Sequence, residues 1–189
     1  NIERIVEQSG DEIFDQLQTL DLVRLRSPIL YPLIGKRLIE QGDLKNAIRV
    51  LSLVSSEHKA YAMALHYKGI AYQLADDPAQ AITLFQDCVK ESERLSNKGS
   101  DLQRKRYSVN GDTCRANIAR SLYQEKKYKK ALKYWNSIDK KSYIWPLTLI
   151  EKAWAYYYLK DYNGALGLLV TYKSPLLESY FIPEAEVLK

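Results

Sequence analysis

Few residues of this chain have the types and spacing that catalysis or metal binding requires. The chain has two histidines, His58 and His66. No carboxylate or cysteine stands at a ligand spacing from either one. Neither a His-Glu-x-x-His motif, a glycine-rich phosphate loop nor a nucleophilic serine elbow occurs. The sequence therefore predicts a protein that is not an enzyme and that holds no metal and no cofactor.

The two cysteines, Cys88 and Cys114, are the other residues with intrinsic reactivity. Two are too few for a disulfide scaffold or a cysteine-based zinc module. Cys88 stands at a predicted core position, and Cys114 lies near the start of a predicted helix. Two buried thiols are the default expectation, and a disulfide between Cys88 and Cys114 is the alternative.

A run of lysines is the densest concentration of charge. Its members are Lys126, Lys127, Lys129, Lys130 and Lys133, followed by Lys140 and Lys141. Such a run could bind nucleic acid, an acidic protein or lipid headgroups. The net charge is only +5 at pH 7, whereas dedicated DNA-binding domains gather more charge on one face. We therefore expect a solvated outer surface here, with binding of an anionic partner as the alternative, and nucleic acid is not the expected partner.

Length and composition describe an ordinary globular chain. It has 189 residues, of which 46% are hydrophobic and 27% charged, which is typical of folded domains. No run approaches eighteen apolar residues, so no transmembrane helix is predicted. The chain begins at Asn1 without a signal peptide, and we expect it to be a processed or excised piece of a longer protein.

Small and bulky residues recur at fixed spacings along the chain. Four similar turns are each followed by an alanine: Ala47, Ala81, Ala131 and Ala165. The interval between the first two equals that between the last two, and the middle interval is longer by sixteen positions. Twelve residues before each alanine stand Gly35, Gly69, Ala119 and Ala153. Four residues after each stand Leu51, Phe85, Trp135 and Leu169.

This alternation is what two closely packed helices in each repeat require. A small residue on the first helix lets the second helix approach, and the alanine of the second helix fills that contact. The bulky residues then fill the space toward the neighbouring repeat. The spacing therefore predicts a tandem array of helix pairs.

The pattern resembles the tetratricopeptide repeat (TPR) family, whose period of about 34 residues is the interval between the paired alanines. The resemblance covers residues 28–61, 62–95, 112–145 and 146–179. It implies an all-α fold, a right-handed α-solenoid of helix-turn-helix repeats that binds other proteins. The tryptophan common early in the family's first helix is absent, and its places are taken by Tyr31, Leu65, Arg115 and Leu149.

The repeat frame predicts the helices and the organisation of the chain. First helices are expected over 28–41, 62–75, 112–125 and 146–159. Second helices are expected over 44–56, 78–95, 128–137 and 162–172. Residues 1–27, with helical stretches at 2–8 and 12–22, are interpreted as an N-terminal cap or degenerate repeat.

Three further segments complete this division of the chain. Residues 28–95 hold repeats 1 and 2, and residues 112–179 hold repeats 3 and 4. Residues 96–111 are a charged insertion, formed by an extended second helix and then a charged helix or loop. Residues 180–189 begin a further or capping helix, so we expect the native chain to continue or this helix to dock as a partial cap.

The resemblance places the ligand on the concave side, which the first helices line. The candidates at the family's groove positions are Lys36, His66, Ile70, Gln73, Asn117, Arg120, Tyr123, Glu151, Trp154, Tyr157 and Tyr158. Exposed aromatic residues with arginine are typical anchors of an interface. A peptide or a helix in the groove is the expected ligand.

Two of these assignments have structural alternatives. Most of Tyr156, Tyr157 and Tyr158 are expected to be core packing, whereas Trp154 is the better candidate for exposure. In one TPR subclass, lysine, asparagine and arginine grip a terminal carboxylate, which would suit Lys36, Asn117 and Arg120. Pro32 stands where that subclass has a lysine, so the clamp is the weaker reading.

The predicted function is that of a non-catalytic scaffold whose partner is another protein or a peptide. One alternative is a structural spacer or assembly subunit in a larger complex, and another is an anionic-partner binder acting through Lys126–Lys141. The stretches 152–156, 165–166, 174–178 and 181–185 more weakly resemble bacterial cell-envelope TPR proteins of gliding and predatory species. This favours a bacterial periplasm or envelope location, with the cytoplasm as the alternative.

Overall fold

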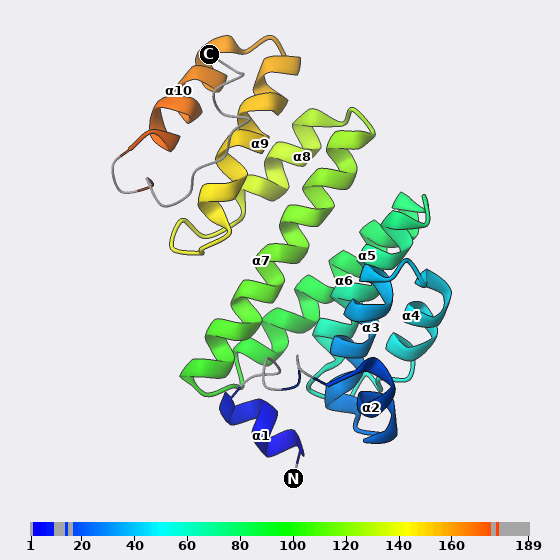
Figure 1. Ribbon diagram of the computed structural model, residues 1–189. Helices are drawn as coiled ribbons and strands as arrows, with labels where there is room; N and C mark the ends of the chain where they lie inside the picture. The colour runs from blue at the N-terminus through cyan, green and yellow to red at the C-terminus, as the bar shows by residue number, and fades with distance from the viewer. Residues whose placement is uncertain (1, 10–13, 15–16, 175–176, 178–189) are drawn as a thin grey trace. The chain divides into compact units, whose positions relative to one another are not determined.

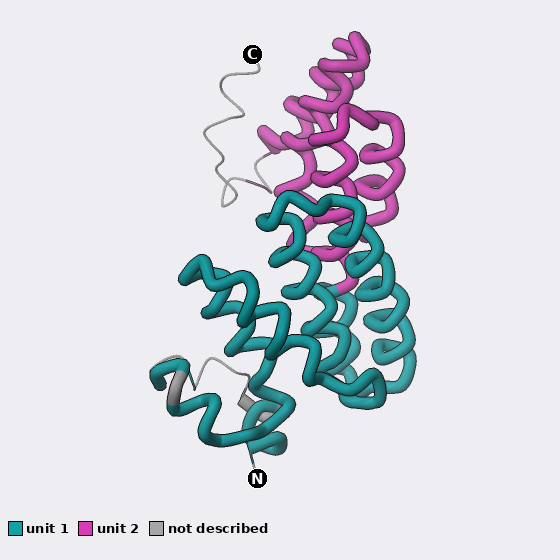
Figure 2. Tube along the Cα trace, turned by 90° about the vertical axis from the view of Figure 1, so that its right-hand side faces the viewer, with its two compact units in different colours: residues 1–110 teal, residues 111–189 magenta. Residues whose placement is uncertain are grey.

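The computed structural model describes residues 2–9, 14, 17–174 and 177, and within these ranges every regular element is a helix (Figure 1). The chain divides into two compact units, residues 1–110 and 111–189 (Figure 2). Helix α7 belongs partly to each unit. The all-α fold agrees with the prediction.

The first unit contains two helix pairs and an N-terminal region. The N-terminal elements are α1 (Ile2–Ser9), α2 (Thr19–Arg24) and the 3-10 helix η2 (Pro28–Leu30). Then come α3 (Tyr31–Glu40) with α4 (Leu44–Leu51), and α5 (Tyr61–Leu74) with α6 (Pro78–Ser96). Each pair packs together, and α4 also packs on α5, so successive helices form a continuous layer.

The second unit repeats this arrangement. It contains the last part of α7 (Asp101–Gln124), α8 (Tyr128–Asn136), α9 (Trp145–Tyr158) and α10 (Tyr162–Tyr172). Helices α9 and α10 pack as a pair, and α8 packs on α9. The bounds of α9 and α10 agree with the predicted helices to within one residue.

In repeats 1 and 2 the small residue of the first helix contacts the bulky residue of the second helix in the same pair. The prediction placed the alanine in that contact and the bulky residue toward the neighbouring repeat, so it is wrong about the bulky residue. A Cβ atom added to Gly35 would stand 2.5 Å from Leu51, and one added to Gly69 would stand 2.5 Å from Phe85. Gly35 and Gly69 therefore mark the closest approach of the two helices in repeats 1 and 2. In the second unit, the equivalent Ala119 is completely buried.

Substituting Gly69 by alanine should destabilise the fold. The new methyl group would collide with the Phe85 ring, which costs about 1–2 kcal/mol after the gain in helix propensity is subtracted. Gly167 on α10 is the matched control because a Cβ there meets nothing within 4 Å. Gly167→Ala should stabilise by about 0.5–1 kcal/mol. Urea unfolding of both variants measures the two signs, and equal effects would contradict the packing account.

The turn within each helix pair has a recurring structure. A residue with positive φ ends the first helix, and these residues are Gly42, Asp76, Lys126 and Lys160. The next residue caps the second helix in three repeats. The side chains of Asp43, Asp77 and Asp161 accept backbone N–H bonds at 3.3, 3.0 and 2.9 Å. In repeat 3 Lys127 takes this place and makes no side-chain cap.

Lys127→Asp should therefore stabilise the fold. An aspartate N-cap contributes about 1 kcal/mol, and the exposed Lys127–Glu125 ion pair that is lost contributes less. We expect a net gain of about 0.5–1 kcal/mol in thermal or urea unfolding. Lys141→Asp makes the same change of charge at an exposed loop position and serves as the control. A gain of equal size in the control would assign the effect to net charge rather than to capping.

The N-terminal region departs from the prediction, whereas the insertion has the predicted extended second helix followed by a charged helix. Helix α1 matches the stretch predicted at 2–8, but within 12–22 the described helix begins only at Thr19. The insertion, residues 96–111, contributes the end of α6, a short turn and the first turns of α7. Helix α7 therefore runs without a break from the insertion into repeat 3. The helix predicted for 180–189 lies outside the described residues.

The cysteines differ from expectation in their chemistry. Cys88 and Cys114 are both completely buried, and neither is a free thiol in this structure. The expectation of two buried thiols is therefore right about burial but wrong about the thiols, because both cysteines are disulfide-bonded.

Among the described helices, none combines the length and the apolar character needed to span a bilayer.

Candidate functional site

Aromatic side chains gather in the second unit where α9 ends. Tyr158 lies flat against Tyr128, with ring centroids 5.2 Å apart and an angle of 10° between the planes. Its edge also meets Tyr123 of α7 at 6.0 Å. Tyr157 contacts both Trp154 and Tyr162, at 5.9 and 5.8 Å. We call Trp154, Tyr157, Tyr158 and Tyr162, with Tyr123 and Tyr128 beneath them, the aromatic surface.

Exposure within the aromatic surface is the reverse of what the sequence suggested. Tyr157 and Tyr158 are 47% and 51% exposed, and Tyr162 is 59% exposed. Trp154, expected to be the exposed anchor, is partly buried and packs against the core that α9 shares with α10. Tyr157 and Tyr158, which were expected to be mainly core packing, are therefore more exposed than Trp154.

The aromatic surface follows the repeat. Tyr123 and Tyr157 are one repeat period apart, and so are Tyr128 and Tyr162. The edge-on pair of Tyr123 and Tyr128, at 5.3 Å, recurs as the pair of Tyr157 and Tyr162. Tyr128 and Tyr162 were not among the predicted site residues. Comparing equivalent positions of repeats 3 and 4 would have found them.

A polar group lies on the same helices, α7 and α9. The Arg120 Nε donates to Glu151 Oε1 at 2.6 Å, and the Arg120 Nη1 donates to Asn117 Oδ1 at 2.8 Å. The Arg120 side chain is 38% exposed and that of Glu151 is 29% exposed. The second Glu151 oxygen, Oε2, is buried and accepts no hydrogen bond from the described residues. The part of this group that a ligand can meet is therefore the partly exposed Arg120 side chain.

The carboxylate clamp fits this geometry poorly. Arg120 already holds the carboxylate of Glu151, so a ligand carboxylate would compete with an ion pair inside the protein. The Asn117 oxygen is likewise engaged with Arg120. Lys36, in the first unit, is exposed, and its Nζ lies 3.9 Å from Glu40 Oε1 in an ion pair on α3.

The first-unit candidates divide between core and surface. His66 is only 8% exposed; its Nδ1 lies 3.0 Å from Asn110 Oδ1, and its ring stacks on Tyr67. Contrary to its assignment as a groove residue, His66 is part of the core. Ile70 and Gln73 are partly buried on α5.

The second unit also buries a charge that the sequence did not single out. Lys152 on α9 is 4% exposed, and its Nζ lies 5.6 Å from the Trp145 ring centroid. Burial lowers the pKa of the Lys152 ammonium, and nearby Lys140 lowers it further. The face of Trp145 offers this cation a partial compensation.

The predicted lysine run is exposed, as a solvated surface requires. We call Lys126, Lys129, Lys130, Lys133, Lys140 and Lys141 the lysine surface, and all six side chains are exposed. Within the run, Lys127 pairs with Glu125 at 2.6 Å. The six residues of the lysine surface make no ion pair with other described residues.

Tyr123 is the aromatic residue whose environment changes its ionisation. Burial raises the pKa of its hydroxyl to about 12, and the neighbouring Tyr158 and Tyr128 add to the rise. A raised pKa means that the folded state favours the neutral hydroxyl. The stability that this provides is present below pH 10, the unfolded value, and is lost as the pH rises to about 12.

Tyr123→Phe should therefore flatten the loss of stability in alkali. Because phenylalanine cannot ionise, the variant's free energy of unfolding should fall less than that of the wild type between pH 10 and about 12. Urea unfolding across this range measures the difference. Tyr143→Phe, at a 54% exposed position, is the control and should follow the wild type. Parallel curves for all three proteins would refute the assignment.

Comparison with known proteins bears on the repeat and the fold. Residues 63–92, which cover most of α5 and α6, match the tetratricopeptide repeat family. This segment is a tetratricopeptide repeat. The other helix pairs carry the same spacing of small and bulky residues, so the chain is an all-α array of TPR-like helix pairs.

Two solved structures are similar to the chain. PilF of Pseudomonas aeruginosa superposes with a TM-score of 0.58 at 18% identity, over 85% of this chain and 67% of that one. YrrB, described as a TPR protein with an unusual peptide-binding site, gives a TM-score of 0.31 at 13% identity, over 89% of this chain and 95% of that one. The PilF similarity shows the fold alone. A search of curated proteins finds no match.

Proposed function

We propose that this chain is a protein-interaction scaffold that binds a peptide or protein segment on the first-helix side of its second unit. The observation that carries the proposal is the aromatic surface. Tyr157 and Tyr158 remain about half exposed although they contact other rings. Such residues give a partner a large apolar contact at a small cost in conformational entropy.

The polar group of α7 and α9 suits the same role. Arg120 is held in place by Asn117 and Glu151, so little side-chain freedom is lost when a partner binds. The partly exposed Arg120 guanidinium favours a partner that brings a hydrogen-bond acceptor, such as a backbone carbonyl. The expected ligand is a segment with an apolar or aromatic side chain beside an exposed backbone carbonyl group.

The proposal involves no catalytic step. The described residues contain no group of histidine, cysteine, aspartate and glutamate side chains that could hold a metal ion. What supports binding is the tetratricopeptide repeat at residues 63–92 and the exposed aromatic side chains. Repeat arrays of this kind use their extended surfaces to bind.

Tyr157→Ala should abolish most of the binding. Cross-linking capture with the full-length protein from its native cell identifies the partner, and fluorescence anisotropy with that purified partner gives the Kd. A central aromatic contact is worth about 2 kcal/mol or more, so the Kd should rise at least about thirtyfold. The matched control is Tyr143→Ala, since Tyr143 is 54% exposed and lies outside the aromatic surface.

The two variants give a clear contrast. Loss of affinity in Tyr157→Ala, with Tyr143→Ala within about twofold of the wild type, supports the proposal. Equal affinities for both variants, with circular dichroism showing that each is folded, would overturn it. The partner would then bind elsewhere on the chain.

The lysine surface favours a second candidate, an anionic partner. Its six exposed lysines have no ion pair among the described residues. Repeating the anisotropy measurement at about 50 and about 200 mM salt separates the two candidates. A steep loss of affinity with salt that Lys129→Glu and Lys130→Glu abolish would support the lysine surface. Weak salt dependence would leave the aromatic surface as the binding site.

A further inference from the structure

A cavity of about 150 Å³ opens in the first unit. Its apolar lining comes from five elements and the turn before α5, and consists of Val6, Ile29, Pro32, Ala60, Met63 and Leu102. Leu102, Gln103, Arg106 and Tyr107 belong to the insertion that interrupts the repeat period. The insertion therefore forms one wall of a cavity that the regular helix pairs alone would not enclose.

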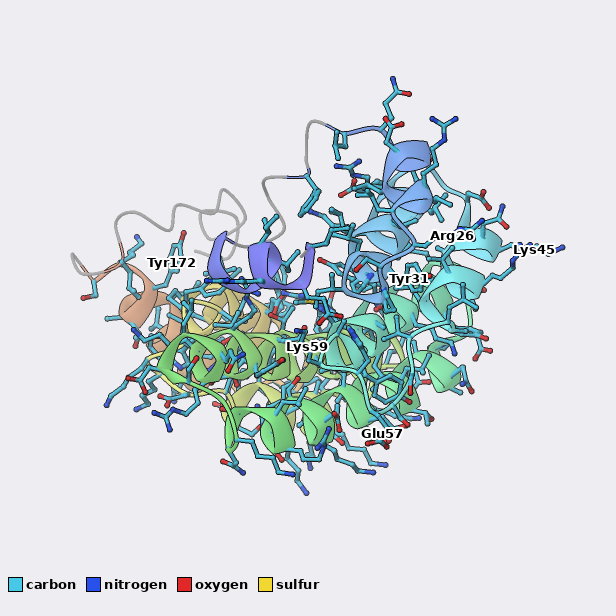
Figure 3. All side chains as sticks on the ribbon, turned by 90° about the horizontal axis from the view of Figure 1, so that it is seen from below. Arg26, Tyr31, Lys45, Glu57, Lys59 and Tyr172 are labelled. Carbon is cyan, nitrogen blue, oxygen red and sulfur yellow. The ribbon has the colours of Figure 1, made fainter. Side chains whose placement is uncertain are left out.

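Hydrogen bonds connect the polar residues at the cavity and join the insertion to them. The Lys59 Nζ lies 3.0 Å from Glu3 Oε2, and the His58 Nε2 lies 3.3 Å from Glu3 Oε1. The Tyr107 hydroxyl donates to the Lys59 carbonyl at 3.2 Å, which ties the insertion to the turn before α5. Figure 3 shows Lys59 beside α1, the helix that carries Glu3.

Charge at the cavity is unevenly balanced. The bonds from Lys59 and His58 lower the pKa of the Glu3 carboxyl, so Glu3 stays ionised and neutralises Lys59. Arg106 also lines the cavity, is exposed, and makes no ion pair or hydrogen bond with the described residues. After Glu3 and Lys59 cancel, a positive charge remains at the rim of an apolar cavity.

We infer that this cavity binds an apolar side chain of an acidic protein segment, whose neighbouring carboxylate pairs with Arg106. A cavity of about 150 Å³ accepts a group the size of benzene, so a leucine, methionine or phenylalanine side chain fits. The choice of a protein segment rests on the proposed scaffold function. The apolar lining does not suit a nucleic acid backbone, which needs rows of cations.

The single methionine of the chain makes the cavity directly observable. Met63 lines it and is the only methionine in the sequence. Protein labelled with ¹³C at the methionine methyl group therefore gives one native methyl NMR signal, assigned by its absence in Met63→Leu. The probes are three acetylated and amidated pentapeptides, Gly-Leu-Glu-Glu-Gly, Gly-Ala-Glu-Glu-Gly and Gly-Leu-Gln-Gln-Gly.

The expected result has two parts. Gly-Leu-Glu-Glu-Gly should shift the Met63 methyl signal saturably, and the alanine peptide should not reach saturation. The glutamine peptide should bind about fivefold more weakly than the glutamate peptide, because a partly exposed ion pair is lost. Arg106→Gln should weaken binding of the glutamate peptide by about the same factor and leave binding of the glutamine peptide unchanged. Lys105 is an exposed neighbour that does not line the cavity, so Lys105→Gln should change the Kd of neither peptide by more than about twofold.

Three results would overturn the inference in protein that circular dichroism shows to be folded. These are a Met63 signal that does not move, equal binding of the leucine and alanine peptides, and equal effects of Arg106→Gln and Lys105→Gln. Tyr157→Ala, which tests the proposed function, should leave this titration unchanged. The cavity site and the aromatic surface can thus fail independently.

Discussion

The close approach of two helices at a small residue is the constraint on which the rest of this structure depends. At Gly69 the two helices are so near that an added methyl group would stand 2.5 Å from Phe85. This contact fixes how one helix of a pair sits on the other. Because the contact recurs with the repeat period, the residues around it recur in space as well. The two edge-on tyrosine pairs of repeats 3 and 4 are a direct consequence.

Features set by local chemistry could be predicted from the sequence. Helices α9 and α10 begin and end where the spacing indicated, because their turn carries its own signals: a residue with positive φ and the cap of Asp161. The sequence analysis left the start of α7 open between helix and loop, although the Ser100 N–H donates to Gln103 Oε1 there as in a capping box. The charged stretch before Gly111 contains no strong helix stop, and its role as a cavity wall depends on Met63 and Val6, which are distant in sequence. His66 was misassigned for a similar reason, since its partner Asn110 lies 44 residues away.

Exposure was harder to predict than position because it depends on what covers each helix. Leu132 and Leu166 are one repeat period apart and occupy equivalent places on α8 and α10. Leu132 is 7% exposed and Leu166 is 60% exposed. Helix α8 packs against the helix that follows it, α9, whereas α10 packs against the helix that precedes it. The same residue type at the same repeat position is therefore core in one repeat and surface in the next. The exposure of Trp154 and Tyr157 was predicted wrongly because the sequence indicates the helix face on which a residue lies but not which other elements pack against that face.

Two adjacent positions of the repeat show how such an array separates folding from recognition. One position holds Gly35, Gly69, Ala119 and Ala153, all small. At Gly35 and Gly69 the second helix leaves no room for an added methyl group, and Ala119 and Ala153 are completely buried. The next position holds Lys36, Ile70, Arg120 and Trp154, four chemically different residues. A helix turns by about 100° per residue, so these neighbours face different surroundings: the first faces the partner helix and the second faces away from that contact. Packing requires the first position to stay uniform, whereas the second can differ in every repeat without loss of the fold. Chemical variety on the first-helix side, and therefore selectivity for a ligand, can arise from residues that the packing does not restrict.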